Sequence, residues 1–134
     1  MVDSKVDEIR QWLVKADHDL RSARQLFSVD PPLLDTAVYH CQQTAEKALK
    51  AYLTLKDTTF LKTHVLPVLV EQCMKIDPSF AALLDVADLL TPYAVAFRYP
   101  GDVLEPEIDE VREALDAGEK VLNFVLTRIP EVTK

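Results

Sequence analysis

Apolar residues recur at intervals of three and four through most of the chain, and this spacing constrains the fold more than any other feature. In the first stretch, residues 4–27, the recurring positions are Ile9, Trp12, Leu13, Ala16, Leu20, Ala23 and Phe27. Such a pattern places the apolar side chains along one face of an α-helix. The 134 residues include only 2 glycines, which leaves few tight turns for an all-β fold. The sequence therefore predicts an all-α protein.

Prolines and short polar stretches divide this pattern into five helical segments. The consecutive prolines of "SVDPPLL" end the first segment, because proline lacks an N–H and clashes with the preceding turn. Pro92 lies inside the fourth segment and predicts a kink near Asp88–Leu89. The expected segments are 4–27, 34–56, a short one at 64–75 with Thr63 as its N-cap, 78–97 with Asp77 as its N-cap, and 106–129 opened by Pro106. We expect an up-and-down four-helix bundle with an additional short helix, as a single domain over residues 1–134.

The second segment has a seam of small residues. Ala37, Cys41, Ala45 and Ala48 recur on its apolar face. Because these side chains are short, a neighbouring helix can approach the backbone closely there. This seam is also a possible surface for helix-mediated assembly.

The charge of the chain argues against DNA binding. The net charge is -7, so nothing attracts the protein as a whole to nucleic acid, and any phosphate site must be a local basic patch. The charge is also uneven, since residues 102–134 carry a net charge of -5 and residues 1–101 carry -2. The last segment should therefore present an acidic face.

The cysteines and the N-terminal residues indicate a cellular compartment. Cys41 and Cys73 are far apart in apolar surroundings and have no metal-ligand spacing, so we expect two free buried thiols, no metal site and no cofactor. Free thiols suit a reducing cytoplasm. The opening "MVDSKVDEIRQWL" is charged throughout, and no apolar run reaches membrane-spanning length. We expect a soluble cytoplasmic protein without a membrane partner.

A polar stripe beside the small-residue seam is the first candidate for chemistry. His40, Gln43, Lys47 and Lys50 are spaced three, four and three residues apart. Two lysines one turn apart can hold a phosphate. Long side chains at such positions can also extend from a packed helix into solvent, with Glu46 and Asp57 offsetting their charge nearby, so the spacing leaves both interpretations open.

Two further stretches carry candidate residues. In "KTHVL", His64 lies at an expected helix start, where it could act as a base, bind phosphate, or only hydrogen-bond to a loop. In "AFRYPGD", Pro100 and Gly101 explain why a helix stops. They do not explain Arg98, whose guanidinium needs an acid or an anion. An ion pair between Arg98 and Asp102 would be the structural explanation.

The order of three motifs resembles one known family. "AVYHCQQTAEKALKAYL", "KTHVLPVL" and "AFRYPGD", followed by an acidic last helix, look like the HEPN domain of higher eukaryotes and prokaryotes, from about Trp12 to Val125. The resemblance implies a helical bundle that dimerises and is similar to the substrate-binding domain of certain nucleotidyltransferases. Prokaryotic members are often encoded beside a small nucleotidyltransferase and can form a toxin–antitoxin pair with it, and many toxin members are metal-independent RNases.

The RNase signature of this family is incomplete in the chain. The signature is an arginine, four to six residues, and then a histidine. Arg98 matches the arginine, but the histidine positions hold Val103, Leu104 and Glu105. None of these transfers a proton at neutral pH as histidine does, unless the pKa of Glu105 were strongly raised. We therefore expect no efficient RNase activity.

Three hypotheses are consistent with the resemblance and the residues. The first is a dimeric subunit that binds a nucleotide, or RNA phosphate, and works with a small nucleotidyltransferase. Its ligand contacts would come from Lys47, Lys50, His64, Arg98 and Tyr99, with Tyr93 as a second residue able to stack on a base. The second is an RNase toxin in which His64 serves beside Arg98 in place of the missing histidine. The third is a protein-docking helical scaffold.

Overall fold

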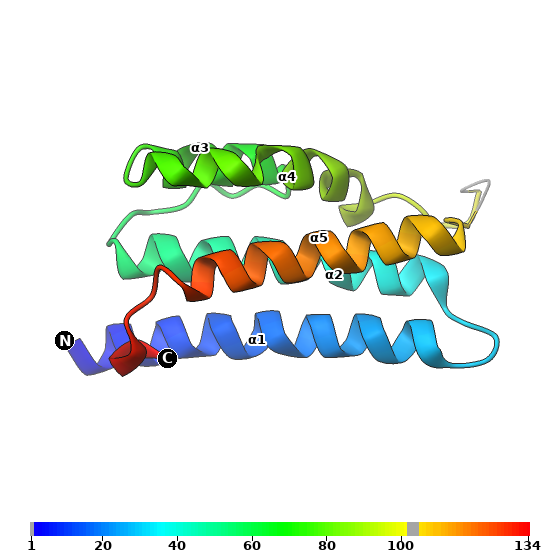
Figure 1. Cartoon of the computed structure of the whole chain (residues 1–134), viewed down its shortest axis with the longest axis horizontal. Helices are drawn as coiled ribbons and strands as arrows, with labels where there is room; N and C mark the ends of the chain where they lie inside the picture. The colour runs from blue at the N-terminus through cyan, green and yellow to red at the C-terminus, as the bar shows by residue number, and fades with distance from the viewer. Residues whose placement is uncertain (1, 102–104) are drawn as a thin grey trace.

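Two long antiparallel helices, α1 (Val2–Ser28) and α2 (Leu34–Leu55), pack together, and α5 (Ile108–Leu126) packs along α2 (Figure 1). In this view α1 forms one side of the molecule, and α2 and α5 lie in the middle. A layer of shorter helices covers the other side. The computed structural model describes residues 2–101 and 105–134, and within them the chain is helical with no strand, so the all-α bundle is confirmed. The remaining elements are α3 (Leu66–Met74), α4 (Leu84–Leu90) and the 3₁₀ segments η1 (Pro78–Leu83), η2 (Thr91–Ala94) and η3 (Glu131–Thr133).

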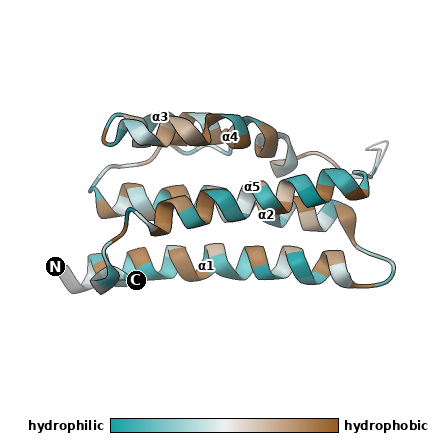
Figure 2. Ribbon diagram, in the orientation of Figure 1, coloured by the Kyte–Doolittle hydropathy of each residue, from teal (hydrophilic) through white to brown (hydrophobic). Residues whose placement is uncertain are grey.

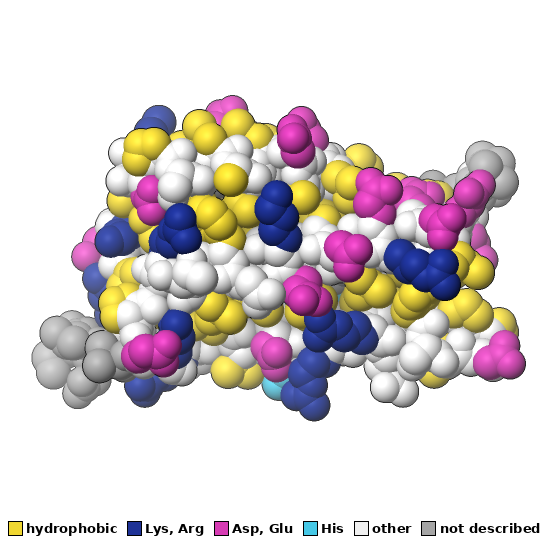
Figure 3. Space-filling view, viewed as in Figure 1, with side chains coloured by type: hydrophobic (Ala, Val, Ile, Leu, Met, Phe, Trp, Pro, Cys, Tyr) yellow, Lys and Arg dark blue, Asp and Glu magenta, His cyan; other side chains and the backbone are white. Residues whose placement is uncertain are grey.

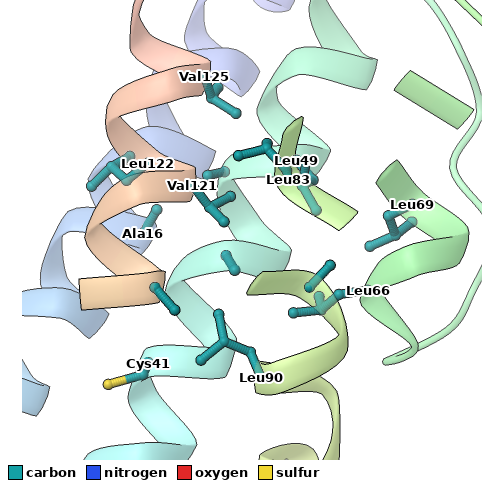
Figure 4. Close-up of a cluster of buried hydrophobic side chains, with 14 of the residues drawn as sticks. Ala16, Cys41, Leu49, Leu66, Leu69, Leu83, Leu90, Val121, Leu122 and Val125 are labelled. Carbon is teal, nitrogen blue, oxygen red and sulfur yellow. The ribbon is translucent and has the colours of Figure 1, made fainter. Parts of the chain in front are cut away.

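The apolar faces predicted for the long helices form the core. Figure 2 shows hydrophobic residues alternating with hydrophilic ones along α1 and α5, as amphipathic helices require. In Figure 4, Leu49 of α2, Leu83 of η1 and Val121 of α5 lie close together between the helices. All three are fully buried. Phe80 fills the same interior, with its ring 4.4 Å from that of Tyr52.

The small-residue seam brings α5 close to α2, as expected. A Cβ added at Gly118 would stand 3.2 Å from the carbonyl oxygen of Cys41. Ala45 and Ala48 continue the buried seam along α2. The short side chains therefore set the distance between the two helices.

The fourth predicted segment, 78–97, is not one helix. It divides into η1, the seven-residue α4 and η2, and it ends at Ala94. The predicted kink near Asp88–Leu89 is instead a change from α-helix to 3₁₀-helix at Thr91, because Pro92 has no N–H to donate to the preceding turn. Asp77 caps η1 as predicted, and its Oδ1 accepts a hydrogen bond from the Ser79 amide at 3.0 Å.

Two other helix starts lie later than predicted. α3 begins at Leu66, and Thr63 does not cap it: the Thr63 hydroxyl accepts from the Val65 amide at 3.0 Å, within the preceding turn. α5 begins at Ile108 and not at Pro106, and its Glu110 accepts from the Glu107 amide at 3.3 Å. Because Ile108 stands at the helix start, it is 48% exposed instead of joining the core.

Candidate functional site

A reversal of the chain after η2 positions Arg98. Phe97 adopts a φ of 66°, a left-handed conformation that non-glycine residues rarely take. Its ring is held against Tyr93, with the ring centroids 6.3 Å apart. Gly101 also has a positive φ, 97°, but the expectation that Pro100 and Gly101 end the helix is wrong, because η2 already ends at Ala94. The left-handed turn at Phe97 precedes Arg98, whose side chain faces the start of α2.

The guanidinium of Arg98 lies over an aromatic ring. Its Cζ is 4.0 Å from the centroid of Tyr39, and its Nη1 donates to the carbonyl oxygen of Ala94 at 3.1 Å. The stacking fixes the plane of the guanidinium. Asp102, the acid expected to pair with Arg98, lies outside the described residues, as do Val103 and Leu104.

A cavity of about 280 Å³ opens beside this arginine, and we name it the Arg98 pocket. It is lined by Asp35, Thr36, Tyr39, His40, Phe97 and Arg98. Four of these residues belong to the first two turns of α2. The pocket therefore lies at the end of the bundle where α2 begins and where the chain returns from η2 (Figure 1).

Behind the pocket, a buried carboxylate holds two basic side chains. Asp19 of α1 is 7% exposed, and its two oxygens lie 2.7 Å from His40 Nδ1 and 2.5 Å from Lys47 Nζ. Burial alone would raise the pKa of Asp19, but the hydrogen bonds from His40 and Lys47 outweigh burial, and the pKa is lowered. Asp19 is thus ionised at neutral pH.

A second buried carboxylate organises another cluster on α2. Glu46 is 4% exposed, and its oxygens lie 2.8 Å from His64 Nδ1 and 3.1 Å from Lys50 Nζ. Burial would raise the pKa of Glu46, but hydrogen bonds from His64, Lys50 and Gln42 lower it instead. Lys50 also lies 5.5 Å from the ring centroid of Trp12. The cluster ties the loop before α3 to α2.

The structure thus separates the predicted site residues into three places. Lys47 contacts Asp19, Lys50 and His64 share Glu46, and Arg98 lines its own pocket. Phosphate binding by Lys47 and Lys50 stays a prediction, since both lysines already contact buried carboxylates. The histidine that shares a pocket with Arg98 is His40, and His64 is not among the lining residues.

Of the two acids that organise the site, Glu46 is expected from the sequence to offset the charge of the lysines, and its pairing with Lys50 agrees, whereas Asp19 is not expected. Asp57, the other acid expected to do so, pairs with Lys5 instead. A signal for both exists: each is an acidic residue on an apolar helical face, Asp19 three residues after Ala16 and Glu46 three residues before Leu49. A carboxylate on such a face must be paired when the helix packs. The pattern indicates that a partner is needed, but it does not identify the partner.

The two tyrosines proposed to stack on a base differ in their exposure. Tyr99 is 63% exposed. Tyr93 is 6% exposed, and its hydroxyl donates to Glu110 at 2.6 Å, so the expectation that Tyr93 stacks on a base is wrong. Burial and the neighbouring Glu110 carboxylate together raise the pKa of Tyr93.

The surface charge follows the uneven sequence. On the face shown in Figure 3, acidic side chains gather over the start of α5, while basic and acidic side chains are interspersed elsewhere. Across residues 2–101 and 105–134, no group of three or more His, Cys, Asp or Glu side chains could hold a metal ion. Both cysteines are free and buried, as predicted.

No helix within the described part of the chain combines the length and apolar character needed to cross a membrane.

Comparison with known proteins assigns the chain to a family. The crystal structure of TT1696 from Thermus thermophilus is similar, with 28% sequence identity and a TM-score of 0.77, and the match covers 90% of this chain and 98% of TT1696. The crystal structure of ST0689, described as an archaeal HEPN homologue, is also similar, with 26% identity and a TM-score of 0.71, and the match covers 91% of this chain and 98% of ST0689. No curated protein sequence matches the chain. The family model for the HEPN domain matches residues 9–129. The chain therefore belongs to the HEPN domain family.

Proposed function

We propose that this protein is a nucleotide-binding HEPN subunit that holds phosphate in the Arg98 pocket and works with a small nucleotidyltransferase partner in a toxin–antitoxin-like pair. One observation carries the nucleotide-binding part of the proposal. The guanidinium of Arg98, stacked on Tyr39, borders a cavity that also contains the side chains of Thr36 and His40.

The chemistry of the pocket suits the phosphate end of a nucleotide. A guanidinium offers a planar set of N–H donors that matches two phosphate oxygens. A volume of about 280 Å³ holds a phosphate with part of a sugar, so the base would extend outside the pocket, where Tyr99 is exposed. The carboxylate of Asp35 can accept a hydrogen bond from a sugar hydroxyl.

In this proposal the two lysines act indirectly. Lys47 and Lys50 neutralise Asp19 and Glu46, and so remove negative charge that would repel a phosphate near α2. His64 fixes the loop before α3 through Glu46. Direct phosphate contacts then come from Arg98.

The same proposal includes a protein partner and excludes efficient RNA cleavage. Positions 103–105 lack the histidine of the RNase signature. We propose that the protein works as a cytoplasmic homodimer bound to the nucleotidyltransferase, and that the purified protein leaves RNA intact. RNA cleavage that is lost in Arg98→Ala would overturn this part.

The first test is thermal unfolding with AMP, ATP, GTP and short RNA. A ligand at 100 times its dissociation constant stabilises the folded state by about 2.7 kcal/mol, which is easily measured. We expect stabilisation by a nucleotide that is lost in Arg98→Ala and retained in the control Arg112→Ala. Arg112 is a suitable control because its guanidinium also lies near an aromatic ring, at 5.7 Å from Phe27, but belongs to α5.

The absence of any shift with all four ligands would contradict the nucleotide-binding proposal. The partner is tested separately, by co-purification with a small nucleotidyltransferase encoded beside this protein. Partner binding without nucleotide binding, unaffected by Arg98→Glu and Lys47→Glu, would support a docking scaffold instead.

A further inference from the structure

We propose that His40, held by Asp19, is a second phosphate-binding group of the Arg98 pocket, and that the pocket takes up a proton when it binds a phosphate monoester. This inference rests on the proposed function and adds to it a second binding residue, a ligand charge state and a dependence on pH. The proposal above names His40 only as a residue that lines the pocket and gives it no contact with the ligand.

The orientation of the His40 ring follows from its bond to Asp19. An ionised carboxylate can only accept hydrogen bonds, so the Nδ1 that lies 2.7 Å from Asp19 Oδ1 carries a hydrogen. The other ring nitrogen, Nε2, then points away from Asp19. His40 lines the Arg98 pocket, and its side chain is 27% exposed. Nε2 is therefore the nitrogen that can meet a ligand there.

The charges around His40 come from three elements. Asp19 faces it from α1, Asp35 and Lys47 lie on α2, and Arg98 follows η2. Lys47 already neutralises Asp19, because its Nζ lies 2.5 Å from the second carboxylate oxygen. Asp19 therefore orients the ring, but its negative charge is already shared with Lys47 and does not fully balance a positive charge on His40.

A phosphate monoester changes this balance. It carries nearly two negative charges at neutral pH, whereas Arg98 supplies one positive charge and Asp35 adds a negative one. A second positive charge at His40 would reduce the excess of negative charge in the occupied pocket and allow Nε2–H to donate to the phosphate. Since an opposite charge nearby favours the charged form of a titratable group, ligand binding should draw a proton onto His40.

The alternative role for His40 is purely structural. A histidine that only bonds to Asp19 would stabilise the α1–α2 pair, but its protonation would not respond to an anion. Protonation linked to ligand binding separates the two roles, because histidines titrate between about pH 5 and 8.

The test is calorimetric titration with AMP and with sulfate over that pH range, in buffers of different ionisation enthalpy. Sulfate is the important probe, because it does not titrate in this pH range, so any proton taken up on binding is taken up by the protein. We expect uptake of up to one proton, and affinity that rises by up to tenfold for each unit fall in pH. His40→Gln should bind sulfate more weakly and with little pH dependence. The control His18→Gln, at an exposed position of α1, should behave as the unchanged protein.

An NMR titration of the histidine ring protons provides a second measurement that does not require a variant to fold. Sulfate should move the titration midpoint of His40 to higher pH and leave that of His18 in place. If sulfate and AMP bind through Arg98 but His40 does not respond and His40→Gln keeps the same pH dependence, this inference fails alone. If neither probe binds, or if binding survives Arg98→Ala, the proposed function fails with it.

Discussion

The backbone of Gly118 lies so close to that of Cys41 that a side chain at Gly118 would stand 3.2 Å from the Cys41 carbonyl oxygen. Both residues are in the middle of long helices, α5 and α2, and Cys41 is fully buried. Neither backbone can withdraw without moving the turns packed around it. The α2–α5 spacing is therefore sensitive to a change in sequence at Gly118.

We predict that Gly118→Ala destabilises the protein by about 1 kcal/mol. Alanine favours a helix over glycine by roughly 1 kcal/mol, so a change governed by helix propensity alone would be stabilising. The contact with Cys41 should reverse that sign. Urea unfolding measures the difference, and a more stable variant would show that α2 can move aside.

The hydrogen bond between Tyr93 and Glu110 should contribute to stability. It joins η2 to the first turn of α5, the two elements that precede and follow Arg98 in the chain. Tyr93→Phe should lower the free energy of unfolding by about 1–2 kcal/mol, because the charged acceptor loses its donor while the ring is kept. Glu110→Gln should cost less, since its amide oxygen still accepts. Equal stability of Tyr93→Phe and the unchanged protein would count against this bond.

Acid should weaken the fold through Asp19 and Glu46. Their pKa values in the folded protein are lowered from 3.8 and 4.5, because hydrogen bonds to His40, Lys47, Lys50 and His64 outweigh burial. A carboxylate whose pKa is lower in the folded than in the unfolded protein stabilises the fold at pH values above its ordinary pKa. This stabilisation is lost as the pH falls through the pKa of the folded protein. The free energy of unfolding should therefore decrease below pH 4.5.

The matched variant for this prediction is Asp19→Asn. It should be less stable than the unchanged protein at neutral pH. The difference between their free energies of unfolding should become smaller as the pH falls below 3.8. Denaturant unfolding at a series of pH values measures this. A gap that stays constant with pH would mean that the ionisation of Asp19 does not stabilise the fold.

Lys47 and Lys50 should affect stability more than ligand affinity. Lys47→Met and Lys50→Met each leave a buried carboxylate with one cation fewer, and should cost about 1–3 kcal/mol. The exposed Lys15→Met removes the same charge and should change stability by less than about 0.5 kcal/mol. A loss of nucleotide affinity in Lys47→Met at unchanged stability would instead make that lysine a direct ligand group.

The two thiols should be unreactive in the folded protein. Burial raises the pKa of Cys41 and of Cys73 to about 12, so almost no thiolate forms near neutral pH. We expect a thiol-specific reagent to modify both residues only after unfolding in denaturant. Rapid modification of either cysteine under native conditions would contradict this.

The sequence predicted the parts of the fold that depend on local spacing. The apolar face of α1 and the small residues of α2 follow from a single periodicity, because each side chain packs according to its position on its own helix. The break at Pro92 was also visible, but the choice between a kink and a 3₁₀ segment depends on packing against other elements. Ile108 fits the period, yet lies outside the core because the helix begins there.

The site was less predictable, because its contacts join elements far apart in the chain. His40 and Lys47 were recognised as one stripe, but their common partner Asp19 lies on another helix, and spacing carries no information about that pairing. The same applies to His40 and Arg98, which reach one pocket only because the chain reverses at Phe97.

The layer of shorter helices, α3, η1, α4 and η2, has a consequence for how the molecule opens. Short helical segments have few internal hydrogen bonds and depend on the surface they cover, whereas α1, α2 and α5 support one another along their lengths. The amide protons of residues 66–94 should therefore exchange with solvent in a partial opening that leaves the three long helices folded. Because Phe97 and Arg98 follow this layer in the chain, the same opening would separate these two lining residues of the Arg98 pocket from α2.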